Sequence, residues 1–174
     1  PNDVQCSVGT VVEKTWNHNY IPEGCPSSSI VTLNFNKTEK NKSDVKLVWM
    51  DGGLRPSHPK AIPDEEYLGE KYSRSGVLMI GDKGVISFGT YGMNPKLYRE
   101  GKKTLFFKTD LEDLDNIHHR AWVEACKQGY GSKAHSKLTS SFDYAGPFTE
   151  SVLMGNLAIR SYMLIGTKSP KYSE

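Results

Sequence analysis

The chain has 174 residues with 22 basic and 20 acidic side chains, a formal net charge of +2, and 37% hydrophobic residues. This is the size and composition of one globular domain, which excludes disordered, collagen-like and disulfide-scaffold proteins. The charge is near neutral and its signs are interspersed, so no basic patch for binding nucleic acid or an anionic membrane is predicted. No apolar run approaches the roughly 18 residues of a membrane span. The patterns predict a soluble protein and leave its compartment, cytoplasm or periplasm, open.

Strands are predicted within the first 107 residues, from the alternation of apolar and polar residues at the start and from short apolar runs further on. The predicted strands are 4–12, 30–35, 45–49, 77–80, 85–88, 96–99 and 104–107. The fourth and fifth are joined by Gly81-Asp82-Lys83-Gly84, whose glycines suit the positive φ of a tight hairpin. Short connections of this kind favour an antiparallel sheet.

Helical spacing appears only in the last third of the chain. One helix is predicted from an N-cap at Asp115 to Gly129, and a second from Pro147 to near Gly166. Asp143, just before the second helix, is expected to order the preceding turn. The sequence therefore predicts a single α+β domain over residues 1–174, an open-faced, predominantly antiparallel β-sheet with helices packed on one face. The face of the sheet opposite the helices is either exposed to solvent or packs against something outside the chain.

The segment 51–75 has three prolines and no clear period, and it is longer than structureless loops usually are. At its start, Trp49, Asp51 and Arg55 surround two glycines. A carboxylate, a guanidinium and an aromatic ring are what a sugar requires, because hydroxyls need polar partners and the C–H face of the ring stacks on an aromatic. A turn in which Asp51 and Arg55 form an ion pair explains the same residues equally well.

The remaining motifs are weaker indications of a functional site. Gly129 to Ala134 matches G-x-G-x-x-A but follows a helix instead of a strand, so it predicts no nucleotide site. His118 and His119 point about 100° apart on a helix and cannot chelate one ion, although one of them near a cleft could donate a proton or a hydrogen bond. Three separated cysteines indicate neither a disulfide framework nor a metal site.

Several strings stand in this order along the chain: Lys46 to Pro56 (KLVWMDGGLRP), Gly76 to Gly84 (GVLMIGDKG), His119 with Trp122 to Lys127 (WVEACK), Phe142 to Pro147 (FDYAGP) and Gly155 to Arg160 (GNLAIR). Together they resemble the C-terminal domain of the Gfo/Idh/MocA family, the glucose-fructose oxidoreductases and inositol dehydrogenases. The combination spans nearly the whole chain.

The resemblance implies a C-terminal substrate and oligomerisation domain truncated at both ends, whose N-terminal Rossmann domain would hold NAD or NADP and a catalytic Lys of a Glu-Lys-Pro motif. No catalytic, cofactor-binding or metal-binding residue is therefore expected in this chain, and it should be inactive alone. The expected substrate-binding residues are Asp51, Arg55, Trp49, Tyr91 and His119. The expected partners are the Rossmann domain, a sugar-like small molecule and a second copy bound through the open sheet face.

Three functions fit these expectations. The whole protein is either an NAD(P)-dependent dehydrogenase acting on a sugar or cyclitol hydroxyl, or an NAD-dependent glycoside hydrolase of the same family. The third alternative is a non-catalytic interaction module. Net turnover of the cofactor distinguishes the first two.

Overall fold

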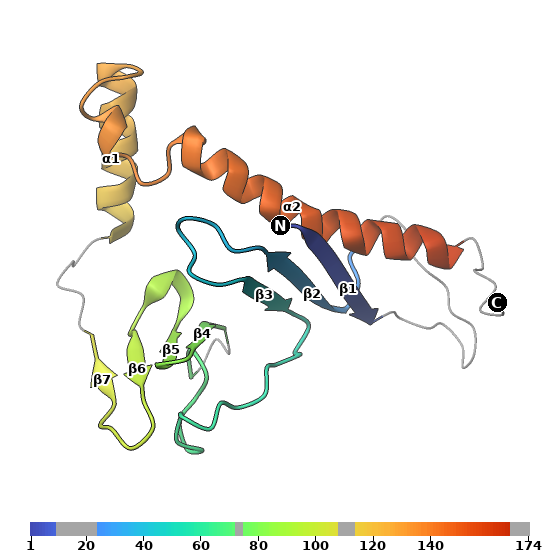
Figure 1. Ribbon diagram of the computed structural model, residues 1–174. Helices are drawn as coiled ribbons and strands as arrows, with labels where there is room; N and C mark the ends of the chain where they lie inside the picture. The colour runs from blue at the N-terminus through green and yellow to red at the C-terminus, as the bar shows by residue number, and fades with distance from the viewer. Residues whose placement is uncertain (10–23, 72–74, 108–113, 168–174) are drawn as a thin grey trace. The chain divides into compact units, whose positions relative to one another are not determined.

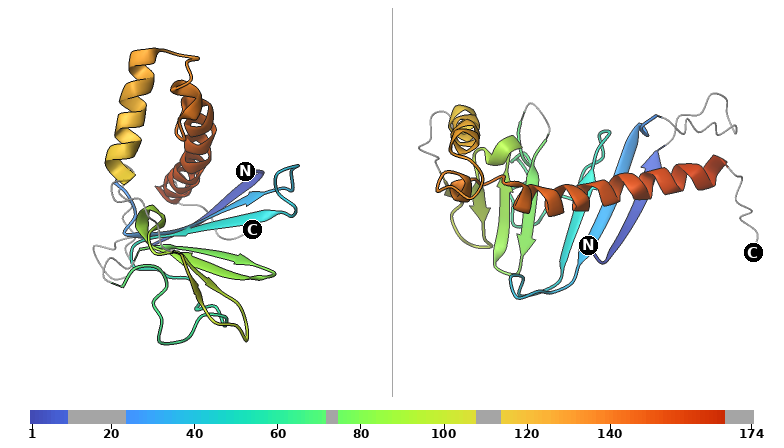
Figure 2. Two further views of the ribbon diagram at one scale, coloured as in Figure 1. Left: turned by 90° about the vertical axis from the view of Figure 1, so that its left-hand side faces the viewer. Right: turned by 90° about the horizontal axis from the view of Figure 1, so that it is seen from above.

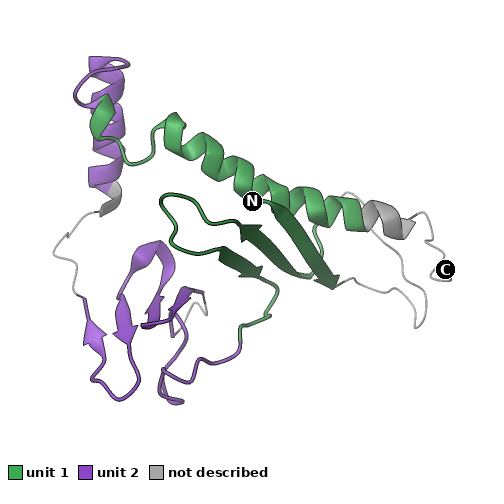
Figure 3. Cartoon of the chain, viewed as in Figure 1, with its two compact units in different colours: residues 1–56, 135–174 green, residues 57–134 purple. Residues whose placement is uncertain are grey.

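The computed structural model describes residues 1–9, 24–71, 75–107 and 114–167. The chain forms two compact units, the first from residues 1–56 and 135–174 and the second from residues 57–134 (Figure 3). Two antiparallel sheets and two long helices confirm the predicted α+β class, although the strands form two sheets and not one (Figure 1).

The first unit holds a three-stranded antiparallel sheet in the order β1-β2-β3. Its strands are β1 (Asp3–Gly9), β2 (Ser28–Phe35) and β3 (Val45–Met50). All three were predicted from their alternation, and β2 is the central strand. The predicted continuation of the first strand to Val11 and Val12 lies outside the described residues.

Helix α2 (Phe142–Thr167) covers one face of this sheet along β1 and β2 (Figures 1 and 2). The register places Val31 opposite both Cys6 and Trp49, so these side chains share a face. Gly155 of α2 is buried against that face, and a Cβ there would lie 3.2 Å from Cγ1 of Val31. The glycine therefore allows the helix to approach the sheet closely.

The start of α2 differs from the prediction. The helix begins at Phe142, not at Pro147, and the amide groups of Tyr144 and Ala145 donate to the carbonyl oxygen of Ser141. Asp143 thus lies inside the first turn, where its charge suits the positive end of the helix dipole. Pro147 lies inside the helix, where it lacks an amide N–H to donate to the carbonyl oxygen of Asp143.

The second unit holds a four-stranded antiparallel sheet in the order β4-β5-β6-β7. Its strands are β4 (Val77–Gly81), β5 (Gly84–Phe88), β6 (Lys96–Tyr98) and β7 (Leu105–Phe106), which confirms both predicted hairpins. Of the two hairpin glycines, only Gly84 has a positive φ, +145°. A short 3-10 turn, η1 (Thr90–Gly92), follows β5.

One face of this second sheet forms the core of the unit. Val85 and Tyr98 lie opposite each other in the ladder and pack with Ile62 from the long connection after β3. Ala61 and Leu68 complete the cover. The long connection thus supplies the apolar residues that bury this face.

Helix α1 (Leu114–Gln128) also belongs to the second unit and begins one residue before the predicted N-cap, so Asp115 lies within the helix. The predicted end is confirmed, because Gly129 has φ +87° and its amide donates to the carbonyl oxygen of Ala125 over 2.9 Å. Within the described part of the chain, neither helix has the length and apolar character needed to cross a membrane.

Candidate functional site

Asp51 fixes the corner where β3 ends. Its Oδ2 accepts hydrogen bonds from the hydroxyl of Ser29 at 2.8 Å and from Nε1 of Trp49 at 3.2 Å, and its Oδ1 accepts the Ser29 amide. Ser29 is 1% exposed, so the carboxylate satisfies two donors that would otherwise be buried without a partner. Gly52 follows with φ +63°, where a Cβ would collide with the backbone of Ser27 and Ser28. The corner is therefore tightly determined by local contacts.

Trp49 lies at this corner with its side chain largely exposed. Its side chain is 62% exposed on the face of the sheet that α2 covers over β1 and β2, while Nε1 is held by Asp51. An indole that is held at Nε1 and largely exposed loses little conformational freedom when a ligand stacks on it. The corner can thus present a preorganised aromatic wall.

Arg55 is exposed and forms no ion pair with Asp51, although both residues lie in the described part of the chain. Tyr91 and His119 belong to the second unit. Tyr91 is 89% exposed with a positive φ of 57°, and His119 is exposed on α1 with its ring 5.8 Å from that of His118. Of the five predicted site residues, the structure brings only Trp49 and Asp51 into contact.

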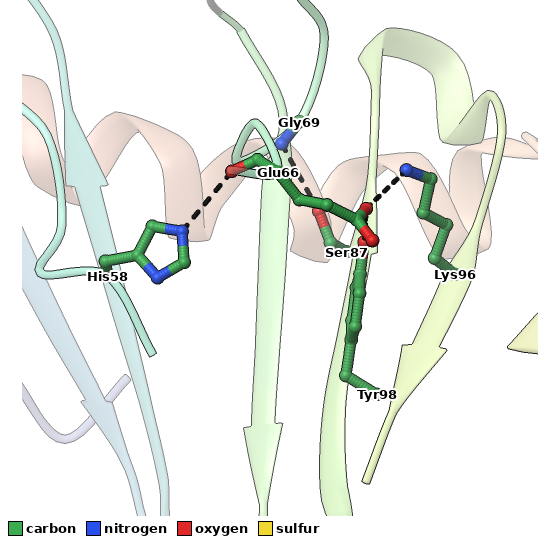
Figure 4. A network of polar contacts seen from close by, with 6 residues as sticks. All are labelled: His58, Glu66, Gly69, Ser87, Lys96 and Tyr98. Atoms are coloured by element: carbon green, nitrogen blue, oxygen red, sulfur yellow. Dashed lines mark hydrogen bonds and ion pairs between the residues drawn. The ribbon is translucent and has the colours of Figure 1, made fainter. Parts of the chain in front are cut away.

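A second polar cluster lies in the second unit (Figure 4). Oε2 of Glu66 accepts hydrogen bonds from Nζ of Lys96 at 2.7 Å and from the hydroxyl of Tyr98 at 2.6 Å. The Lys96 bond, followed by the Tyr98 bond, holds the pKa of Glu66 below its usual value. Burial, followed by the bond to Glu66, raises the pKa of Tyr98. The cluster ties the long connection to β6.

Beside this cluster, the described residues form a cavity of about 490 Å³. Its rim includes Tyr67 and Lys71 from the connection, Met93 from the turn before β6, Lys96 from β6 and Phe106 from β7. The size is within the range of pockets that bind small molecules. Glu66, Lys96 and this cavity were missed from the sequence. The period of two that places Lys96 and Tyr98 on one face of a predicted strand was the available signal.

The G-x-G-x-x-A string of Gly129 to Ala134 follows α1, which ends at Gly129, and leads into η2 (His135–Lys137), a helix of three residues. The string is therefore not the strand-to-helix turn of a dinucleotide fingerprint. The described residues also contain no group of three or more His, Cys, Asp and Glu side chains placed to share a metal ion.

Comparison with known proteins gives no assignment for the chain. No protein-family model matches the sequence, and no curated protein matches it either.

Proposed function

We propose that the chain is the substrate-binding and oligomerisation part of an NAD(P)-dependent oxidoreductase that acts on a sugar or cyclitol hydroxyl. The resemblance of its ordered strings to the Gfo/Idh/MocA family supports this proposal, and so does the α+β architecture. The observation that carries it is the Trp49 corner, where an exposed indole is held by Asp51. Such a wall suits the C–H face of a sugar ring.

The reaction assigned to the whole protein is oxidation of a secondary hydroxyl. Hydride leaves the hydroxyl carbon for the nicotinamide while a base takes the hydroxyl proton, and the product is a ketone with the reduced cofactor. The residues that hold the cofactor and move the proton are assigned outside this chain. Within the chain, Trp49 contacts the substrate and Asp51 is a positioning residue that acts through the indole.

Replacing Trp49 by Ala in the full-length protein is expected to lower kcat/KM about tenfold, since aromatic stacking contributes roughly 1 kcal/mol or slightly more. Trp49→Phe should retain most of the activity because it keeps a ring face. The melting temperature should change little in both variants, because the indole is largely exposed. Equal kcat/KM for the wild type and Trp49→Ala would remove Trp49 from the substrate contacts.

We also propose that a second copy binds the open face of the four-stranded sheet. The register places Val77, Met79, Ile86, Leu97 and Leu105 on the face opposite the Ile62 core. Met79 is 55% exposed, and the charged side chains beside this face, those of Asp82, Lys83 and Arg99, come from the turns that flank the strands. The open face of the three-stranded sheet is different, because it carries polar residues such as Gln5, Thr32 and Lys46. An apolar face of this kind is typical of an isologous dimer interface.

Light scattering at high protein concentration is expected to show a dimer for the wild type and a monomer for a Met79→Lys/Ile86→Lys variant, because burying two ammonium groups in an apolar interface is costly. Val48→Lys, a substitution at a 40% exposed position of the first unit, is the matched control and should stay dimeric. A monomeric wild type would contradict the assignment of this face.

A further inference from the structure

We propose that the second copy binds the open face of the four-stranded sheet in a single orientation, fixed by two symmetric ion pairs between Arg99 of one copy and Asp82 of the other. This inference rests on the proposed dimer and names the contacts that orient it. All the residues that it uses belong to the second unit. The argument starts from the guanidinium group of Arg99.

Arg99 lies at one end of the open face, directly after β6. Its Nε is buried without a hydrogen-bond partner, and its guanidinium group forms no ion pair within the described part of the chain. A buried donor without an acceptor is costly, because it has lost its hydration and gained no bond. A carboxylate contributed by another molecule would supply the acceptor and match the charge.

Two glycines shape the place where the Arg99 side chain lies. Gly81 and Gly84 are opposite each other in the ladder of β4 and β5. A Cβ at Gly84 would lie 2.9 Å from Cγ of Arg99, so the arginine stem passes close over this glycine. A cavity of about 340 Å³ lies at this end of the face. Its lining also includes Met79, Ile86, Leu97 and Asp82.

Asp82 is an acidic residue at the same end of the face. It is exposed in the turn between β4 and β5. Among the described residues its carboxylate forms no ion pair with Arg99 or with the neighbouring Lys83, which is also exposed. One copy therefore presents a cation and an anion that are both available to a partner. Complementary charges of this kind select one orientation at an interface.

A two-fold axis parallel to β5 brings these charges together. In the ladders, Met79, Ile86 and Leu97 form one row across β4, β5 and β6. Rotation about this axis stacks Ile86 on its own copy and Met79 on Leu97 of the second copy. The same rotation places β4 over β6, so Asp82 lies opposite Arg99. Sheets packed face to face are about 10 Å apart, a distance that these two side chains together can span.

A two-fold axis perpendicular to the strands gives a poorer interface. It would place Arg99 against the far end of the face, which carries Val77 and Phe88. A guanidinium group buried against these apolar side chains would have lost its hydration without gaining an acceptor. The charges therefore favour the axis parallel to β5.

Sedimentation equilibrium of the full chain measures the dissociation constant of the dimer. Arg99→Asp and Asp82→Arg should each weaken the dimer about tenfold, because each turns two attractive contacts into repulsive ones. Lys40→Asp, a charge reversal at an exposed position of the first unit, is the matched control and should dimerise like the wild type. Circular dichroism shows whether each variant is folded. If Arg99→Asp is unstable, Asp82→Arg keeps the test decisive, because its turn is exposed.

An equimolar mixture of Arg99→Asp and Asp82→Arg tests the pairing directly. Only a mixed dimer brings opposite charges together at both pairs, so the mixture should associate within about threefold of the wild-type affinity. The double variant Asp82→Arg/Arg99→Asp exchanges the two charges on one chain and should dimerise equally well.

The outcomes separate this inference from the dimer on which it rests. A monomeric wild type would overturn both. A wild-type dimer that Met79→Lys/Ile86→Lys dissociates, but that neither single charge variant weakens, would overturn the ion pairs and leave the apolar face in place. Folded single variants that fail to associate when they are mixed would overturn the pairing of Asp82 with Arg99.

Discussion

Replacing Tyr98 by Ala is expected to lower the free energy of unfolding by about 3 to 5 kcal/mol, the cost of removing a large buried aromatic side chain. Tyr98 is 1% exposed, packs with Ile62 and Val85, and donates a hydrogen bond to Glu66 at 2.6 Å. The variant therefore loses both core volume and a charged hydrogen bond. Urea denaturation followed by circular dichroism measures the loss.

Tyr98→Phe separates the two contributions, because it keeps the ring and removes only the hydroxyl, with an expected loss of about 1 to 2 kcal/mol.

The folded pKa of Glu66 is lowered, so its ionised form contributes stability above its unfolded pKa, and this contribution is lost as the pH falls through the lowered folded value. The wild type should accordingly lose more stability on acidification than Glu66→Gln. A loss below about 1 kcal/mol for Tyr98→Ala would contradict the central place of this residue in the core.

Replacing Asp51 by Ala is expected to lower the free energy of unfolding by about 1 to 3 kcal/mol, because Ser29 is 1% exposed and its amide and hydroxyl would lose their acceptor. Thermal melting of the variant measures this effect. Asp51→Asn keeps one acceptor oxygen and should lose less. An Asp51→Ala variant as stable as the wild type would contradict the structural role assigned to this carboxylate.

Much of the fold could be predicted from local patterns. Strand alternation and the Gly81 to Gly84 turn placed every described strand within a few residues, because these signals depend on neighbouring residues alone. The end of α1 at Gly129 was predicted from a local signal as well. The start of α2 was predicted wrongly, because a proline is expected in the first turn of a helix. The helix instead begins at Phe142, where the carbonyl oxygen of Ser141 accepts the first hydrogen bonds.

The candidate sites were harder to predict than the strands. Trp49 and Asp51 are close in sequence, and their contact follows from the strand end that holds them. Their shared partner Ser29 is 22 residues from Asp51, and its position depends on the pairing of β2 with β3. Glu66 meets Lys96 across 30 residues, so no local pattern linked them. Long-range pairing in a sheet is set by tertiary packing, which a single sequence does not display.

We propose that the chain serves an oxidoreductase acting on a polyol. The most direct measurement is the absorbance of reduced nicotinamide when the full-length protein that contains this chain is mixed with NAD or NADP and a panel of sugars and cyclitols. We expect steady, net reduction of the cofactor in proportion to the oxidised substrate. Hydrolysis of a glycoside without net reduction would favour the glycoside hydrolase alternative. The absence of both reactions with every member of the panel would contradict the proposed function.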